Sequence, residues 1–132
     1  MQRRTAIERL FASDMIENIL AGLDAEALSG SPDAEWAAQT AATIRVKSPL
    51  SLKLALAQVS RGKTWDFETC MRMEFRIVSR IVHDHDFYEG VRAVIVDKDN
   101  KPQWGPATLP EVSEADVERH FAPLGASELV LS

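Results

Sequence analysis

The tetrapeptide HDHD, residues 83–86, has the residue types that bind metal ions. Imidazole nitrogens and carboxylate oxygens are common ligands of zinc and other divalent metals. On an α-helix, however, side chains two residues apart point about 200° apart, so His83 and His85 could not bind one ion there. A strand or turn would restore that geometry, but a polar helix end explains the tetrapeptide without a metal. We therefore expect no metal site.

The segment from Lys98 to Trp104, KDNKPQW, is the stretch best suited to binding a ligand. Its two lysines could hold a phosphate group, and its tryptophan could stack on a flat base. The alternative is a solvated turn whose tryptophan fills a gap in the fold. From these residues alone we favour the solvated turn.

Glu74 and Glu89 are candidate acids or bases, because a carboxylate among apolar neighbours can have a raised pKa. Glu74 lies between Arg72 and Arg76, and an ion pair accounts for it equally well. Cys70 falls on the apolar side of a predicted helix, which favours a buried, inert thiol over a nucleophile. The chain has neither a Gly-x-Ser-x-Gly motif nor a glycine-rich phosphate loop. We expect no catalytic residue.

The composition fits one folded domain over residues 1–132 with a modest core. The chain is 45% hydrophobic, and its formal net charge of −5 argues against a nucleic-acid groove or an anionic membrane surface. A single cysteine excludes an intrachain disulfide and favours a reducing compartment, so we expect a cytoplasmic location. We find neither a signal peptide nor a stretch apolar enough to span a membrane.

The first 45 residues read as three helices. Apolar residues at helical spacing predict a helix over residues 5–12 and a second through Leu23, with Ser13 between them as a cap. Pro32 can occupy the first position of a third helix, which runs to about Ile44.

The segment 48–62 is ambiguous, because leucines at alternate positions also suit a strand. We favour a helix, since Ser48 and Pro49 are typical of the cap and first residue of a helix and Gly62 is typical of a helix end. Thr64 could cap the next and longest helix, which we expect to form the centre of the core. Its predicted core stripe consists of Phe67, Met71, Phe75, Val78 and Val82, with Cys70, Ile77 and Ile81 alongside.

The run VRAVIV, residues 91–96, is β-branched enough to be a strand, but the chain offers it no partner strand. We therefore expect the helix to continue past Asp86. An extended loop with three prolines should follow over residues 97–112, and Ser113 with Asp116 should begin a last short helix that closes near Pro123. The fold class is thus all-α, with about six to seven helices.

Three stretches resemble the C-terminal portion of the 3-hydroxyisobutyryl-CoA hydrolase family, within the crotonase superfamily. They are residues 48–56, 73–104 and 106–125, and the likeness covers most of residues 5–125. Its most specific part is the string Asp86-Phe87-x-Glu89-Gly90-Val91-Arg92-Ala93 followed by Asp97-Lys98-Asp99. Enoyl-CoA hydratases carry a similar string near their own C-terminus.

The resemblance implies that this chain is the helical cap of a larger crotonase-like enzyme that acts on acyl-CoA thioesters. In the family, backbone N–H groups that polarise the thioester and carboxylates that act as acid and base lie in an N-terminal core, which this chain lacks. Oxyanion stabilisation of that kind is commonly the largest catalytic term. The chain alone should therefore be inactive, and no cofactor is implied beyond the acyl-CoA substrate.

The same resemblance implies that Lys98 and Trp104 contact the nucleotide of CoA. The implied partners are the N-terminal crotonase core, acyl-CoA and a second copy of the chain, since broad apolar helix faces usually mark interfaces. The implied pathway is valine catabolism. The alternative is a free-standing helical module without catalytic activity, acting in oligomerisation or partner binding.

Overall fold

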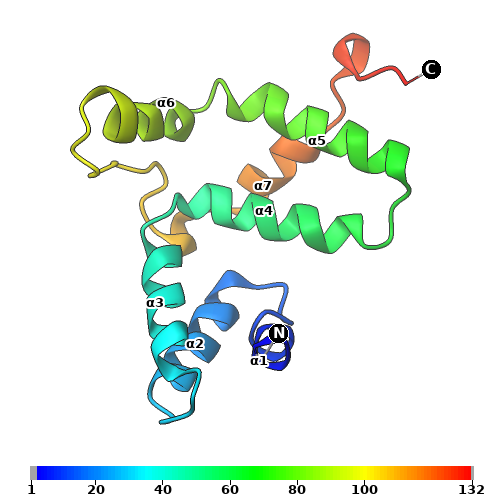
Figure 1. The fold of residues 1–132 in the computed structure, drawn as a ribbon. Coiled ribbons are helices and arrows are strands. Elements are labelled where there is room, and N and C mark those ends of the chain that lie inside the picture. Colours follow the sequence, from blue (N-terminus) through cyan, green and yellow to red (C-terminus); the bar gives the residue numbers. More distant parts are fainter. Residues whose placement is uncertain (1–2, 132) are drawn as a thin grey trace. The chain divides into compact units, whose positions relative to one another are not determined.

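The computed structural model describes residues 3–131, and every regular element in that range is helical (Figure 1). This confirms the predicted all-α class. The α-helices are α1 (Arg4–Leu10), α2 (Ile16–Ala27), α3 (Ala34–Arg45), α4 (Pro49–Gly62), α5 (Phe67–Ile81), α6 (His85–Val91) and α7 (Glu114–Phe121). The remaining elements are a π-helix, η1 (Arg92–Val96), and two 3-10 turns, η2 (Leu109–Glu111) and η3 (Gly125–Ser127).

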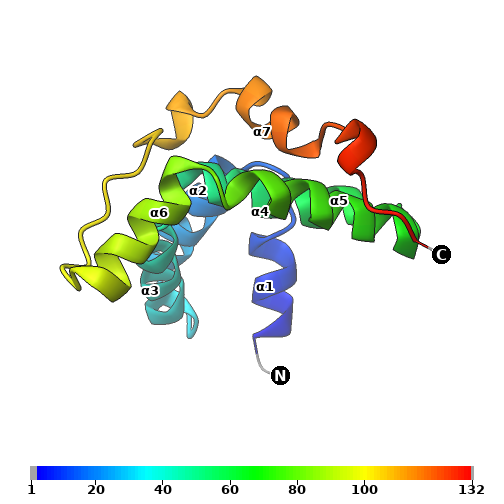
Figure 2. The same cartoon turned by 90° about the horizontal axis from the view of Figure 1, so that it is seen from above.

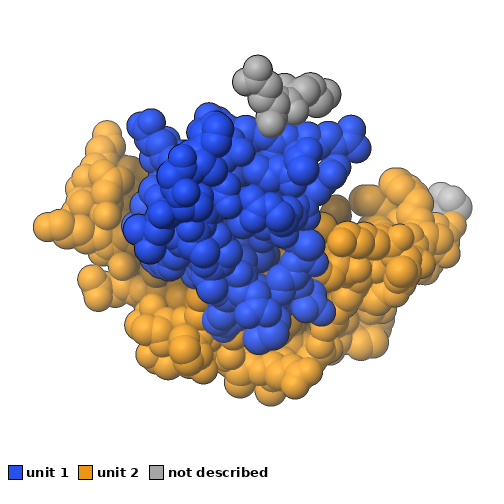
Figure 3. Space-filling model, turned by 90° about the horizontal axis from the view of Figure 1, so that it is seen from below, with its two compact units in different colours: residues 1–47 blue, residues 48–132 orange. Residues whose placement is uncertain are grey.

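Contacts between Cα atoms divide the chain into two compact units, residues 1–47 and residues 48–132 (Figure 3). Helices α1 to α3 belong to the first unit, and every element from α4 onward belongs to the second. The sequence suggests one helical domain over residues 1–132, and this stays a prediction because compact units need not unfold separately. All the candidate residues from the sequence lie in the second unit.

In the first unit, α2 packs against α3. The buried side chains of α2 have the predicted helical spacing and are Ile16, Ile19, Leu20 and Leu23. The cap of α2 differs from the prediction, because Met15 rather than Ser13 is the N-cap, and the Ser13 hydroxyl accepts from the Met15 N–H at 3.1 Å instead. Likewise α3 begins at Ala34, two residues after Pro32.

The core of the second unit lies between α4, α5 and α7. Helices α4 and α5 run in opposite directions, and α7 contacts both (Figures 1 and 2). The buried members of this core are Leu50, Leu54, Met73, Ile77, Val112, Val117 and Phe121.

Helix α4 begins and ends where its sequence signals predict. The Ser48 side chain accepts from the Ser51 N–H at 3.2 Å, and Pro49 occupies the first helical position, where a missing N–H costs nothing. The helix ends at Gly62. The helical interpretation of the alternating leucines is therefore confirmed.

Helix α5 buries only part of the predicted pattern. Its buried residues are Met73 and Ile77, and the predicted Cys70 and Ile81 pack against the core, whereas Phe67 and Val78 are exposed. Both faces are apolar, so the choice depends on the side chains that α4 and α7 present. The cap also differs, because Asp66 rather than Thr64 accepts the Thr69 N–H, at 2.8 Å.

Helix α7 begins with the capping box that the sequence predicts. Ser113 Oγ accepts from the Asp116 N–H, and the Asp116 carboxylate accepts from the Ser113 N–H, both at 3.0 Å. The helix ends at Phe121, two residues before the predicted closure at Pro123. Guanidinium groups from α5 bind the free carbonyls at this end: Arg76 binds that of Phe121, and Arg80 binds those of His120 and Pro123, each at 3.3 Å.

His120 joins α7 to the turn between α5 and α6. Its side chain is 0% exposed, with Nδ1 at 2.8 Å from the Asp116 carbonyl and Nε2 at 2.5 Å from Asp84 Oδ2. A carbonyl oxygen can only accept, so Nδ1 carries a hydrogen. The contact of Nε2 with Asp84 connects α7 to the turn before α6.

Helix α6 continues directly into η1, which confirms a helical rather than extended conformation for VRAVIV. The change to a π-helix was not predicted. The following loop is irregular as expected, except for the turn η2. Within residues 3–131, none of the helices combines the length and the apolar character that crossing a membrane requires.

We expect Leu54→Ala to lower the free energy of unfolding by about 2–5 kcal/mol, because it leaves a cavity at a core position. Leu54 is 3% exposed, whereas Val59 on the same helix is 63% exposed. Val59→Ala is therefore the matched control and should change stability by no more than about 0.5 kcal/mol. Urea denaturation followed by circular dichroism measures both, and equal effects would contradict this core assignment.

Candidate functional site

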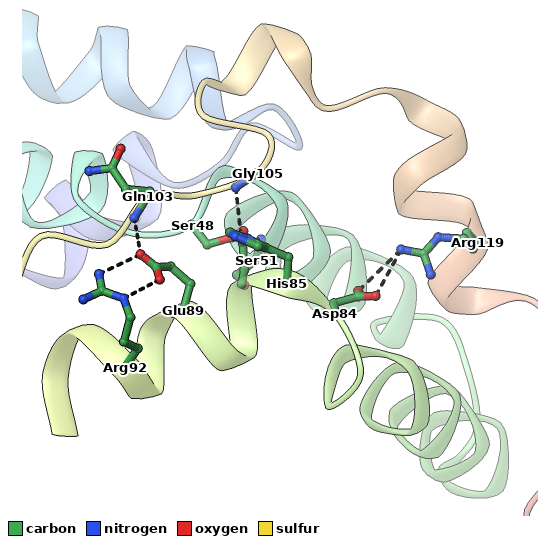
Figure 4. Close-up of polar contacts among 10 residues, drawn as sticks. Ser48, Ser51, Asp84, His85, Glu89, Arg92, Gln103, Gly105 and Arg119 are labelled. Atoms are coloured by element: carbon green, nitrogen blue, oxygen red, sulfur yellow. Dashed lines mark hydrogen bonds and ion pairs between the residues drawn. The ribbon is translucent and has the colours of Figure 1, made fainter. Parts of the chain in front are cut away.

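Two carboxylates on α6 hold the loop that carries the predicted CoA contacts. Asp86 Oδ1 accepts the Gly105 N–H at 2.8 Å, and Glu89 Oε2 accepts the Gln103 N–H at 2.7 Å (Figure 4). The two carboxylates lie three residues apart on one helix, so they face the same side. The segment Gln103–Gly105 is thereby fastened along α6.

Asp86 is the more buried of the two and joins three segments of the second unit. It is 6% exposed and also accepts from Ser48 Oγ, at 2.5 Å, and from His85 Nδ1, at 2.9 Å. Ser48 thus has two roles, since its oxygen caps α4 while its hydroxyl hydrogen is donated to Asp86. The start of α4, the start of α6 and the loop therefore meet at one carboxylate.

Arg92 and three carboxylates form a second group of contacts, which we call the Arg92 network: Arg92, Glu89, Asp97 and Asp99. The guanidinium binds Glu89 through two hydrogen bonds of 2.6 and 2.8 Å. Its Nη1 also donates to Asp97 at 2.9 Å and to Asp99 at 2.8 Å. Planar guanidinium is suited to such multiple contacts, because its five N–H donors have fixed directions.

The Arg92 network shifts the pKa values of Glu89, Asp99 and Arg92. The hydrogen bonds from Arg92, and then that from the Gln103 N–H, lower the pKa of Glu89 from 4.5 to about 2. Hydrogen bonds from Arg92 and from the Lys101 N–H also lower the pKa of Asp99. The pKa of Arg92 is raised by Glu89 first and then by Asp99 and Asp97. Glu89 is therefore an ionised anchor, contrary to the raised pKa that the sequence suggested for an acid.

The loop places Lys98 and Trp104 in different surroundings. Lys98 is exposed at a turn with φ of 57°, and its ammonium group makes no ion pair within the described residues. Trp104 is half-buried, and its six-membered ring lies over Gly90 of α6, where an added Cβ would be 3.5 Å from it. Their assignment as CoA contacts stays a prediction.

The other candidates from the sequence are dispersed. In the HDHD tetrapeptide, Asp84 faces α7 and Asp86 faces the loop, so their carboxylates serve different segments. Over residues 3–131, no three His, Cys, Asp or Glu side chains are grouped so that they could hold a metal ion. Glu74 is exposed on α5, and Cys70 is partly buried against the core.

Sequence reasoning missed the roles of Asp86 and Arg92. The spacing of Glu89 and Arg92, three residues apart on a helix, is a local signal for an ion pair. No comparable signal joins Ser48 to Asp86, because 38 residues separate them.

We expect the contribution of Glu89 to stability to depend on pH. Its folded-state pKa is depressed, so the contribution is complete above the ordinary value of 4.5 and is lost as the pH falls through about 2. The stability difference between the wild type and Glu89→Gln should be constant above about pH 5 and shrink below it. Urea denaturation at a series of pH values measures this difference.

Glu74→Gln is the control, because Glu74 lies outside the Arg92 network on the exposed side of α5. Its stability should match the wild type across the series. A Glu89→Gln difference that does not vary with pH would contradict the assignment.

Comparison with known proteins identifies several that are similar to this chain. A family model described as enoyl-CoA hydratase/isomerase matches residues 1–121. Curated proteins named 3-hydroxyisobutyryl-CoA hydrolase, mitochondrial, are also similar. That of Gallus gallus is 41% identical over 125 residues, covering 95% of this chain and 31% of the relative. That of Homo sapiens is 37% identical over 123 residues, covering 93% of this chain and 30% of the relative. The chain therefore spans about a third of the length of these relatives.

Two solved structures share the fold and much of the sequence. An enoyl-CoA hydratase from Rhodobacter sphaeroides 2.4.1 aligns with a TM-score of 0.83 at 31% identity, over 98% of this chain and 37% of its own. A carnitinyl-CoA dehydratase from Mycobacterium thermoresistibile aligns with a TM-score of 0.79 at 38% identity, over 98% of this chain and 35% of its own. Together with the family match over residues 1–121, these likenesses establish that the chain belongs to the enoyl-CoA hydratase/isomerase family.

Proposed function

We propose that residues 1–132 are the helical C-terminal cap of an acyl-CoA enzyme of the 3-hydroxyisobutyryl-CoA hydrolase type. The observation that carries the proposal is the likeness to those hydrolases over 93% or more of this chain, in a region that is about a third of their length. The whole enzyme would hydrolyse 3-hydroxyisobutyryl-CoA in valine catabolism. Its catalytic groups would lie in an N-terminal crotonase core of the same protein.

An exposed apolar surface supports this role as a cap. The continuous helix of α6 and η1 carries three successive aliphatic residues, Val94, Ile95 and Val96, that are 58%, 63% and 67% exposed. Phe87 and Tyr88, in edge-to-face contact, are exposed on the same helix. Exposed apolar side chains gathered on one helix often mark a contact with another part of a protein or with a partner. We propose that the crotonase core covers it.

We propose Lys98 and Trp104 as contacts of the CoA nucleotide. The Lys98 ammonium would pair with a phosphate group, since it is exposed and makes no ion pair within the described residues. The Trp104 indole, half-buried with its six-membered ring over Gly90, would stack on the base. Acyl-CoA is then the substrate, and no separate cofactor is needed.

The second candidate function is a free-standing module for oligomerisation or partner binding. The same apolar side chains on α6 and η1 favour it, because a second copy of the chain could cover them. Reading the gene upstream of Met1 separates the candidates. An in-frame crotonase core there supports the first, and a promoter with a stop codon supports the second. Sedimentation of the purified chain tests the expected self-association.

The proposed location is the cytoplasm, on the strength of the single cysteine. The curated relatives are named as mitochondrial, which favours the mitochondrion instead. Fractionation of cells that express the whole protein decides between them.

We expect the 132-residue chain alone not to hydrolyse 3-hydroxyisobutyryl-CoA, because the proposed cap carries no oxyanion donors of the family. Release of free CoA, followed with a thiol reagent, measures the reaction. Adding the crotonase core of the whole protein should restore turnover, and the core alone is the control. Turnover by the pure chain would refute the proposal.

We expect Lys98→Ala to weaken the binding of CoA by about 3- to 10-fold, because one charged contact with phosphate is lost. Titration of the labelled chain with CoA by NMR measures affinities in the millimolar range. Lys63→Ala, at an exposed lysine just after α4, is the matched control and should bind like the wild type. Equal affinity for Lys98→Ala and the control would remove Lys98 from the site.

A further inference from the structure

Arg92 contacts both sides of the turn that carries Lys98. Before the turn its Nη1 binds Asp97, and within it the same nitrogen binds Asp99. After the turn its Nη2 lies 3.4 Å from the Lys101 carbonyl oxygen. One guanidinium therefore links positions before, within and after the reversal of the chain.

The helix in turn holds Arg92 in place. Glu89 binds the guanidinium through two hydrogen bonds and also accepts the Gln103 N–H at 2.7 Å (Figure 4). The Asn100 N–H donates to the Ala93 carbonyl at 3.0 Å, which brings the turn back over η1. The turn is thus attached to a rigid helix through side chains as well as backbone.

The turn needs such an attachment because its backbone is strained. Lys98 and Asn100 have φ of 57° and 55°, in the left-handed region. Asparagine tolerates this region, but lysine adopts it only at an energetic cost. A free loop would relax Lys98 to an ordinary conformation. The contacts of Arg92 with Asp97 and Asp99, the two neighbours of Lys98, oppose that relaxation.

The same contacts determine which charges remain available. Asp97 and Asp99 flank Lys98 and would otherwise be its nearest counter-ions. Both carboxylates are bound by Arg92, and the Lys98 ammonium is left without an ion pair among the described residues. The Lys98 ammonium therefore stays available to pair with an anion.

We propose that Arg92 is a positioning residue: it fixes the turn of residues 98–100 and so presents Lys98 to a phosphate group of CoA. This inference rests on the proposed function of Lys98 and adds the residue on which that function depends. Lysine could not replace Arg92, because a single ammonium cannot keep two hydrogen bonds to Glu89 while reaching Asp97 and Asp99.

The test is a double-mutant cycle for CoA affinity in the full 132-residue chain, measured by NMR titration of the wild type, Arg92→Lys, Lys98→Ala and the double variant. We expect Arg92→Lys to weaken binding by about 3- to 10-fold, as Lys98→Ala does, and the double variant to be no weaker than either. Arg72→Lys is the matched control, since Arg72 lies on α5 outside the Arg92 network and pairs with Glu68. It should bind like the wild type.

A second measurement needs no ligand. Hydrogen exchange of the Gln103 and Lys101 amides should become faster in Arg92→Lys, while that of the Leu54 amide in α4 stays unchanged. Asp99→Asn weakens the contact of Arg92 with residue 99 and leaves Glu89 unchanged. It should lower the affinity for CoA by less than Arg92→Lys does, and only when Lys98 is present. It keeps the test decisive if Arg92→Lys does not fold.

Each failure has its own signature. If the wild type does not bind CoA, or if Lys98→Ala binds as well as the wild type, the proposed role of Lys98 fails and the positioning role falls with it. If Lys98→Ala weakens binding but Arg92→Lys does not, the positioning role alone is overturned. Losses that multiply in the double variant would also overturn it, because Arg92 would then act independently of Lys98.

Discussion

The attachment of an irregular loop to one face of α6 underlies the organisation of the candidate site. A segment without regular structure leaves its backbone donors in need of partners. Asp86 and Glu89 supply them by accepting the N–H groups of Gly105 and Gln103. Because these carboxylates belong to a rigid helix, the loop acquires a defined path.

Ionic and polar contacts of the second unit are concentrated where helices end. His120 contacts Asp84 between α7 and the turn before α6, and arginines of α5 bind the carbonyls at the end of α7. Each contact satisfies groups that a helix end or a turn leaves open. The apolar core holds α4, α5 and α7 together, and the polar contacts stabilise the ends of these helices.

The α6–η1 helix carries two groups of side chains that suit different tasks. One side engages the loop through Asp86, Glu89 and Arg92, and the exposed aliphatic residues 94–96 lie beyond it. A cap of an acyl-CoA enzyme needs both a surface that contacts the rest of the protein and a loop that meets the substrate. The proposed function assigns one of these to each.

Local signals in the sequence determined much of the secondary structure. Ser48 with Pro49, and Ser113 with Asp116, act within a few residues of themselves, so the starts of α4 and α7 follow from the sequence alone. The missing partner strand likewise indicated that VRAVIV is helical.

Tertiary structure decided the rest, because the deciding contacts join distant residues. The core face of α5 depended on α4 and α7, which cover Met73 and Ile77 and leave Phe67 and Val78 exposed. Asp86 became a junction only when folding brought Ser48 and Gly105 to it, and Glu89 changed from a candidate acid to an ionised anchor because Arg92 and the Gln103 N–H both bind it.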